Sequence, residues 1–314
     1  MKFAALFPGQ GSQYVGMAKV LREEFSFTRE VFEEASEALK EDLVKLCQDG
    51  PADHLQLTEN AQPCILTTSY AWYQVLRRNL DFKPQSGAGH SLGEYTALLA
   101  SGAMTLTEAV RLVRTRGQLM QSAVPKGVGK MAAVLGLTDD KIEELCQKAT
   151  QGDSIVVPAN FNAPSQVVVA GNADAVDRLT ALAPEYKARK VIPLNVSAPF
   201  HCPLMKPVAE KFMPSLQAVQ WQSRSFPIAH NLDGEIRSSG DLVPLLKDQI
   251  DHPVKWTGCV GALSKNGIEA FVEMGPGKVL TGLVKRISDG AKLFNLDSLD
   301  DLKTFEIFYR ENFK

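Results

Sequence analysis

Apolar residues recur along the chain in two spacings, which predict two kinds of element. Residues 2–7 and 270–273 are short, largely apolar runs that stop at glycine-rich turns, as buried strands do. Longer stretches repeat apolar residues every three or four positions with polar residues between them, which predicts helices covering a sheet. These stretches are residues 15–24, 29–40, 61–79 and 107–122, with Thr107 as the expected N-cap of the last. Together they predict an α/β fold.

Residues 124–196 show a more compact pattern. After Val-Pro-Lys-Gly-Val-Gly, strand-like and helix-like segments follow in the order β-α-β-β-α-β, which is typical of a ferredoxin-like unit. The strands are expected at residues 131–136, 155–159, 166–170 and 188–194, and the helices from Thr138 and over 173–183. We therefore expect a small ferredoxin-like subdomain, residues 124–196, inserted into a larger domain formed by residues 1–123 and 197–314.

The chain after the insertion returns to helical and strand patterns of the larger domain. Helices are expected over residues 241–250 and 254–265, with Pro253 in the first turn of the second. The sequence Gly275-Pro-Gly-Lys278 lacks the Ser or Thr that a phosphate-binding loop needs after its lysine, so we interpret it as a turn into a helix over 279–287. Ser298, with Asp301 following, predicts the start of a last helix.

Composition and charge exclude several classes of protein. The 314 residues carry a net charge of −2 and no long basic run, so nothing suggests a nucleic-acid partner. The five cysteines are scattered without Cys-x-x-Cys spacing, which disfavours a zinc site or a disulfide framework. No apolar run is long enough to span a bilayer, and no secretory signal core precedes Pro8. We expect a soluble cytoplasmic enzyme, monomeric and without a membrane partner.

The strongest chemical signal is Gly89-His-Ser-Leu-Gly93. Small residues precede it, as in a buried strand, and helix formers follow it. A serine on such a strand-to-helix turn needs glycines beside it, and the turn aims helix N–H groups at the reacting centre. Ser91 is therefore a candidate nucleophile. The alternative is a glycine-serine loop that matches by chance, and the motif alone leaves the two readings about even.

Five histidines are candidate bases for this serine. His201 is held between two prolines in a rigid loop after the nucleophile, an order that fits an α/β sheet enzyme. His90 adjoins Ser91, so its side chain is expected to point away. His54 has no partner in view, whereas His230 and His252 remain alternatives to His201.

Other polar residues leave their role open at this level. The loop that carries Gln10 lacks the third glycine of a dinucleotide-binding loop, and its amide is expected simply to satisfy backbone. Arg111, Arg114 and Arg116 share one predicted helix. We expect Arg111 and Arg114 to be solvated or paired with acidic residues. Arg116 stands late in the helix beside Gly117, where the missing side chain leaves room for another group to approach.

Four stretches in register resemble the malonyl-CoA:acyl carrier protein transacylases. They are Phe7-Pro-Gly-Gln-Gly-Ser-Gln13, Gly89-His-Ser-Leu-Gly-Glu94, Ala198-Pro-Phe-His201 and Glu273-Met-Gly-Pro-Gly-Lys278. The likeness covers nearly the whole chain. It implies an α/β-hydrolase-like large domain with the ferredoxin-like insertion, and a ping-pong acyl transfer without a cofactor, with malonyl-CoA as the substrate.

The resemblance also assigns site residues. Ser91 would be the nucleophile and His201 its base, with the backbone carbonyl of Gln249 holding the other ring nitrogen in place of a carboxylate. The backbone N–H groups of Gln10 and Leu92 would form the oxyanion hole.

By the same match, Arg116 would bind the malonyl carboxylate, and Phe200 would disfavour a 2-methyl branch. The acidic acyl carrier protein would be the partner, for which a basic docking surface is expected. The candidates for that surface are Lys187, Arg189, Lys190, Lys285 and Arg286. Three alternatives share parts of the pattern: a serine esterase or thioesterase, an acyltransferase for another acyl-CoA, and a non-catalytic carrier-protein or CoA-binding module.

Overall fold

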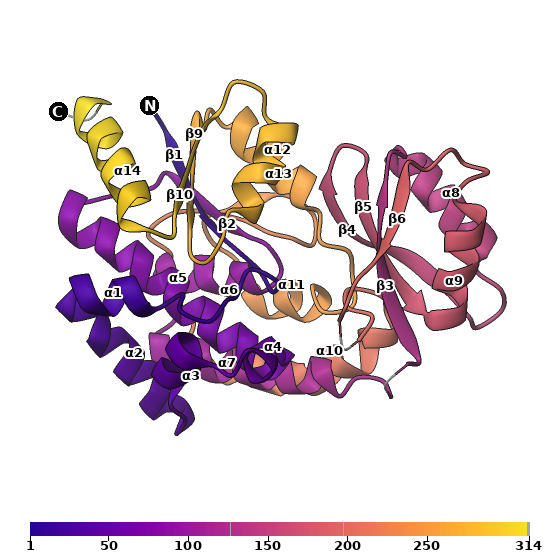
Figure 1. The fold of residues 1–314 in the computed structure, drawn as a ribbon, viewed down its shortest axis with the longest axis horizontal. Coiled ribbons are helices and arrows are strands. Elements are labelled where there is room, and N and C mark those ends of the chain that lie inside the picture. The colour runs from indigo at the N-terminus through magenta and orange to yellow at the C-terminus, as the bar shows by residue number, and fades with distance from the viewer. Residues whose placement is uncertain (126, 197, 313–314) are drawn as a thin grey trace.

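The computed structural model describes residues 1–125, 127–196 and 198–312 and has an α/β fold with two separate sheets. Figure 1 shows the larger sheet and its helices on one side of the molecule and the smaller sheet with α8 and α9 on the other. Residue 197, at which we expected the larger domain to resume, lies outside the described residues, as do Lys126, Phe313 and Lys314. Within the described part of the chain, no helix has the length and apolar character needed to cross a membrane.

The larger sheet is mostly parallel and is buried on both faces. Its strand order is β10-β9-β1-β2-β7-β8, and only the β7–β8 pair within it is antiparallel. The strands are β1 (Phe3–Phe7), β2 (Ser86–Gly89), β7 (Ile228–Ala229), β8 (Ile236–Arg237), β9 (Ala270–Met274) and β10 (Lys292–Leu296). Successive side chains of β1 point into opposite cores, Phe7 into one and Leu6 into the other. This explains the continuous apolar run of residues 2–7.

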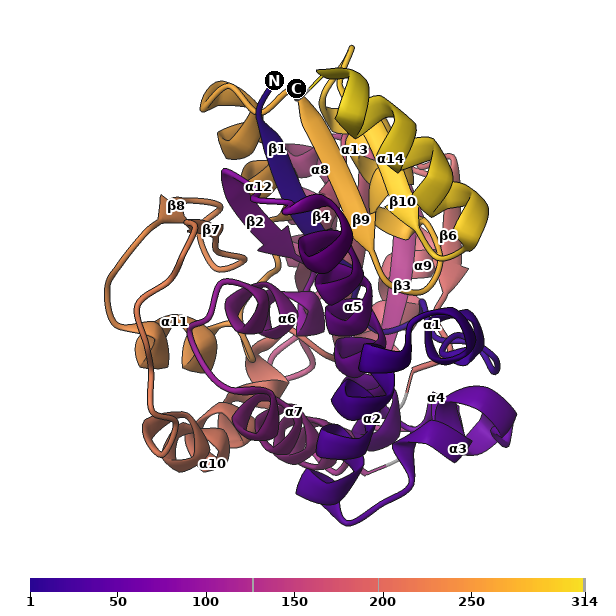
Figure 2. The ribbon, with the colours of Figure 1, turned by 90° about the vertical axis from the view of Figure 1, so that its left-hand side faces the viewer.

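Different helices cover the two faces. Helices α12 (Trp256–Lys265) and α13 (Val279–Ile287) pack on the face that carries Leu6. Figure 2 shows α5, α6 and α7 below the strands, on the side of the other face. The helices of that core are α1 (Lys19–Glu24), α2 (Ser26–Leu39), α3 (Leu43–Asp49), α4 (Ala52–Gln56), α5 (Thr58–Leu80), α6 (Leu92–Ala100), α7 (Leu106–Gln121), α10 (Lys206–Gln217), α11 (Leu242–Asp248) and α14 (Leu299–Asn312).

Helix α5 differs from the covering helix that residues 61–79 predicted. Most of its residues are buried, including Thr67, Thr68 and Ser69, so it has no broad polar outer face. The hydroxyl of Thr67 donates to the carbonyl of Pro63 at 2.8 Å, which satisfies a polar group inside the core. Helix α5 is therefore a central helix that contacts α2, α6 and α7 as well as the sheet.

Two predicted helix starts are wrong. The N-cap of α7 is Thr105 instead of Thr107, because the Thr105 hydroxyl accepts from the N–H of Glu108 at 3.2 Å while the Glu108 carboxylate accepts from the N–H of Thr105 at 2.9 Å. Thr107 donates to Glu34 at 3.0 Å. Helix α12 begins at Trp256, so Pro253 lies before it and outside its first turn.

The smaller sheet is antiparallel, with strand order β4-β5-β3-β6. Its elements follow the chain as β3 (Gly129–Leu135), α8 (Asp139–Ala149), β4 (Val156–Ala163), β5 (Gln166–Asn172), α9 (Ala173–Leu182) and β6 (Lys190–Pro193). Helices α8 and α9 cover the face that carries Val134 and Val167, whereas Met131 and Val168 on the opposite face join the core of the larger sheet. Strand β4 continues past the predicted end at residue 159. As a result, backbone hydrogen bonds of 2.9 Å link Val254 to both Ala159 and Phe161.

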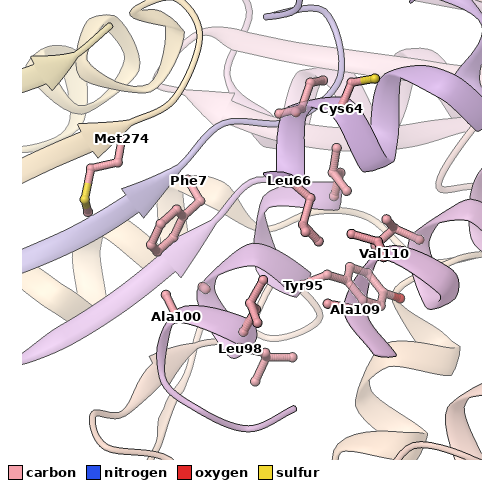
Figure 3. Close-up of a cluster of buried hydrophobic side chains, with 14 of the residues drawn as sticks. Phe7, Cys64, Leu66, Tyr95, Leu98, Ala100, Ala109, Val110 and Met274 are labelled. Carbon is pink, nitrogen blue, oxygen red and sulfur yellow. The ribbon is translucent and has the colours of Figure 1, made fainter. Parts of the chain in front are cut away.

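Figure 3 shows the packing between the sheet and the central helices, with Phe7 of β1, Leu66 of α5, Tyr95 of α6 and Val110 of α7 in one cluster. Because Tyr95 lies in the second turn of α6 and is fully buried, this cluster fixes the helix whose N-terminus follows Ser91. The core thus fixes the position of the turn that carries Ser91.

Candidate active site

Ser91 lies on a tight turn between β2 and α6, with a positive φ of 51° and ψ of −102°. Glycines permit this turn: a Cβ on Gly89 would lie 1.9 Å from the carbonyl carbon of Gly93. The side chain of Asn231 clamps the strained backbone, since its Oδ1 accepts from the N–H of Ser91 at 2.7 Å and its Nδ2 donates to the carbonyl of Gly89 at 2.8 Å. The serine hydroxyl is consequently held at one place in the site.

The structure brings Ser91, His201 and Gln249 together from three distant parts of the chain. The Oγ of Ser91 lies 2.7 Å from Nε2 of His201, and Nδ1 of the same ring lies 2.8 Å from the backbone carbonyl of Gln249. A carbonyl can only accept, so Nδ1 carries the proton and Nε2 is free to accept the hydroxyl proton. This is the geometry of a general base and its nucleophile.

Burial of His201, together with the nearby guanidinium of Arg116, lowers the pKa of the imidazole to about 3. Both effects disfavour the charged ring. His201 is therefore neutral at physiological pH and able to accept a proton.

The rival histidines have other partners. His90 Nε2 lies 2.7 Å from Oδ1 of Asn162 on β4, so it links the nucleophile loop to the smaller sheet. His230 is fully buried and lies 2.7 Å from a carboxylate oxygen of Glu94. His252 is exposed and contacts Asp251. Of the candidate bases, His201 is the one that contacts the serine hydroxyl.

Arg116 is almost wholly buried, with 1% of its surface exposed, and reaches the nucleophile. Its Nη2 donates to Oγ of Ser91 and to Oε1 of Gln249, each at 3.0 Å, and its Nη1 donates to Oε1 of Gln62 at 2.9 Å. The guanidinium lies over the Tyr95 ring, 5.1 Å from its centroid. The adjacent Gly117 lets α7 pack closely against the start of α5, because a Cβ at that position would lie only 2.6 Å from the backbone of Glu59.

Gln10, Leu92 and Phe200 line a cavity of about 650 Å³ together with Ser91 and His201. Leu92 is the first residue of α6, where backbone N–H groups lack helical partners. Among the described residues, neither the N–H of Leu92 nor that of Gln10 donates a hydrogen bond. The two groups are thus available to an incoming oxyanion.

The five candidate docking residues are exposed but lie on both units of the molecule. Lys187, Arg189 and Lys190 lie where α9 leads into β6, and Lys285 and Arg286 lie in the last turn of α13. Arg286 is already engaged: it donates to the carbonyl of Pro164 at 2.7 Å and to the side chain of Gln166. Arg286 therefore also ties α13 to the turn between β4 and β5.

Sequence reasoning missed the polar groups that support these residues. Gln62, Glu94 and Asn231 are each buried and hydrogen-bonded around Ser91 or Arg116. Glu94 was visible only as the last residue of the serine motif. The other two lie far from that motif in sequence and carry no local signal.

Comparison with known proteins places this arrangement in a family. The family described as "Acyl transferase domain" matches residues 5–292. The malonyl CoA-acyl carrier protein transacylase of Escherichia coli (strain K12) is 45% identical over 289 residues, which cover 92% of this chain and 93% of that protein. The corresponding Bacillus subtilis (strain 168) protein is 41% identical over 307 residues, 98% of this chain and 96% of its own.

Solved structures agree. An acyl carrier protein S-malonyltransferase from Vibrio cholerae has a TM-score of 0.94 at 43% identity and covers 97% of this chain and 100% of its own. A malonyl-transacylase solved in complex with a type II polyketide synthase acyl-carrier protein has a TM-score of 0.94 at 40% identity, covering 97% and 98%. The chain is a member of the acyl transferase domain family and groups within it with the malonyl CoA-acyl carrier protein transacylases.

Proposed function

We propose that this chain transfers the malonyl group of malonyl-CoA to the phosphopantetheine thiol of acyl carrier protein through a malonyl-serine intermediate, and so supplies fatty acid elongation. The observation that carries the proposal is the position of Ser91 Oγ, which lies 2.7 Å from the base His201 and 3.0 Å from the buried cation Arg116. A nucleophile beside a cation suits an acyl group that ends in a carboxylate.

In the first half-reaction, Ser91 Oγ bonds to the thioester carbonyl carbon as Nε2 of His201 takes the hydroxyl proton. The Gln249 carbonyl, 2.8 Å from Nδ1, stabilises the imidazolium. The N–H groups of Gln10 and Leu92 bind the oxyanion. The C–S bond then breaks, and the departing CoA sulfur takes the proton from His201.

The second half-reaction runs the same steps with the carrier-protein thiol. His201 takes the thiol proton as sulfur attacks the ester carbonyl, and returns it to Ser91 Oγ as the C–O bond breaks. No cofactor is needed, because a thioester is already a reactive acyl donor.

Arg116 and Phe200 set the acyl specificity in this proposal. Arg116 binds the free carboxylate by charge-assisted hydrogen bonds, which an acetyl group cannot accept. Phe200 lines the cavity and disfavours a branch at carbon 2 of the malonyl group.

The finer architecture is also proposed. The parallel sheet and its helices support an α/β-hydrolase-like domain of residues 1–123 and 197–314, and the antiparallel sheet supports a ferredoxin-like subdomain of residues 124–196. We further propose that the chain acts as a cytoplasmic monomer. Acyl carrier protein would dock on the basic residues Lys187, Arg189, Lys190, Lys285 and Arg286.

Intact-mass spectrometry with malonyl-CoA, acetyl-CoA and methylmalonyl-CoA tests the function. A malonyl adduct that is absent from Ser91→Ala and passes to holo acyl carrier protein is the expected result. Rapid release of free malonate would instead indicate a hydrolase, and no adduct from any donor would indicate a binding module. A preference for another donor would reassign the substrate.

A further inference from the structure

A buried carboxylate lies next to the candidate active site, in the first turn of the helix that follows Ser91. Glu94 is 1% exposed and accepts hydrogen bonds from three sides. Its donors are Nδ1 of His230 at 2.7 Å, the backbone N–H of Asn231 at 3.2 Å and Nε2 of Gln249 at 2.8 Å. Glu94 does not touch the Ser91 hydroxyl, and the transfer steps above leave it without a role.

The contacts of His230 fix the direction of its hydrogen bond to Glu94. The other ring nitrogen of His230, Nε2, lies 3.5 Å from the Arg224 guanidinium, which can only donate. Nε2 is therefore the accepting nitrogen, and Nδ1 carries the proton that it donates to Glu94. Glu94 therefore accepts all three of these hydrogen bonds.

Glu94 also fixes which way the Gln249 side-chain amide points. The amide nitrogen donates to Glu94 at 2.8 Å and to the backbone carbonyl of Ser91 at 3.0 Å, and the amide oxygen accepts from Arg116 at 3.0 Å. A reversed amide would set its oxygen against two acceptors and its N–H groups against a guanidinium. Only one orientation of Gln249 satisfies all three neighbours.

We propose that Glu94 is a positioning residue for acyl selectivity. By orienting the Gln249 amide, it holds the Arg116 guanidinium in the orientation that binds the substrate carboxylate. This inference rests on the proposed malonyl transfer. Arg116 donates to two amide oxygens, from Nη1 to that of Gln62 and from Nη2 to that of Gln249. A guanidinium has more N–H donors than these contacts use, so donors remain for a ligand.

The same arrangement explains how a cation can be kept in a dry site before substrate arrives. Among the described residues, Arg116 donates directly only to neutral oxygens, while the negative charge that favours its ionised form lies beyond Gln249, on Glu94. A direct Glu–Arg ion pair would compete with the substrate carboxylate. Relaying the attraction through an amide leaves the guanidinium available.

The test measures rates of Ser91 acylation by malonyl-CoA and by acetyl-CoA in the full-length protein, with intact-mass detection. Glu94→Gln keeps the shape of the side chain but removes its charge and its ability to accept from all three donors. We expect the malonyl rate to fall about tenfold or more while the acetyl rate changes little, so the selectivity ratio falls by a similar factor. Gln249→Met, which keeps the catalytic backbone carbonyl, should lower the ratio in the same way if Glu94→Gln fails to fold.

Glu273→Gln is the matched control. Glu273 is also fully buried, but it lies on β9, and its carboxylate accepts from the N–H groups of Leu280 and Thr281 at the start of α13. This variant should lower the melting temperature and leave the selectivity ratio unchanged. An equal loss for both donors in Glu94→Gln, or additive effects of the Glu94 and Gln249 changes in the double variant, would overturn the positioning role. A wild-type protein that forms no malonyl adduct would overturn the proposed function itself, and this inference with it.

Discussion

Helix α7 carries two buried arginines whose hydrogen-bond partners differ in charge. Arg114 and Arg116 stand two positions apart and are 8% and 1% exposed. Arg114 forms an ion pair with Glu41 and donates to the amide of Asn60 at 2.5 Å. Arg116, on the side that faces Ser91, donates only to neutral oxygens among the described residues.

The difference separates an arginine whose charge is compensated within the protein from one for which we propose a role in binding. A buried charge is costly unless a partner compensates it, and Arg114 has that partner within the protein. Arg116 lacks a direct carboxylate partner and faces a cavity, so the missing partner is expected to come from a ligand. Burial and residue type are the same in the two cases, and the neighbours decide the role.

The largest effect is expected from Arg116→Gln. Losing the charge-assisted bonds to the substrate carboxylate should lower the rate of Ser91 acylation by malonyl-CoA by about 100-fold or more, with little change for acetyl-CoA. Because the variant also removes a buried charge, we expect the melting temperature to fall little although the acylation rate falls strongly. Rapid-quench acylation assays with both donors, beside a melting curve, would measure this. A parallel loss for both donors would contradict the binding role.

Burial and the charge of Arg116 together affect the protonation of His201 and, through it, the stability of the protein. Burial and Arg116 lower the pKa of His201 to about 3, from an ordinary value of 6.5. The unfolded state therefore takes up a proton below pH 6.5 while the folded state does not, so stability is complete above pH 6.5 and falls between pH 6.5 and 3. For His201 alone the loss by pH 5 is about 2 kcal/mol.

Urea unfolding of wild type and His201→Asn at pH 7 and pH 5 measures this term. The variant should lose about 2 kcal/mol less than wild type over that interval. Equal slopes in the two proteins would show that His201 titrates normally in the folded state.

Arg114→Met should produce the reverse of the Arg116 result. It leaves the buried amide of Asn60 without its donor, while Glu41, whose side chain is 52% exposed, remains solvated. We expect a loss of about 1 to 2 kcal/mol of unfolding free energy and an unchanged malonyl-to-acetyl ratio. A changed ratio would mean that the two sides of α7 are coupled.

The sequence predicted most of what is local in this site. The nucleophile turn could be recognised because its glycines, serine and following helix are adjacent in the chain. The sequence distinguished Arg116 from Arg114 only by the neighbouring Gly117, and the space beside that glycine is filled by the backbone of Glu59 at the start of α5. The pairing of His201 with the Gln249 carbonyl followed only from the family resemblance, since a backbone carbonyl leaves no mark on residue type.

The remainder depended on contacts between distant segments. Asn231 clamps Ser91 from 140 positions away, and nothing around it marks it as part of the site. The polar residues Thr67, Thr68 and Ser69 favour an exposed face for residues 61–79, yet all three are buried, and the Thr67 hydroxyl donates to the carbonyl of Pro63 inside the core. The short strands β7 and β8, two residues each, are too brief to show a periodic pattern.

The smallest effect tests the start of α7, which both arginines share. Thr105→Ala removes the hydroxyl that accepts from the N–H of Glu108, and should cost about 1 kcal/mol of stability. Thr107→Ala loses only a partly exposed bond to Glu34 and should cost a few tenths of a kcal/mol. Urea unfolding ranks the two, and a larger loss at Thr107 would reverse the cap assignment. Neither change should alter acyl selectivity, because the cap stabilises the start of α7 and contacts neither Arg114 nor Arg116.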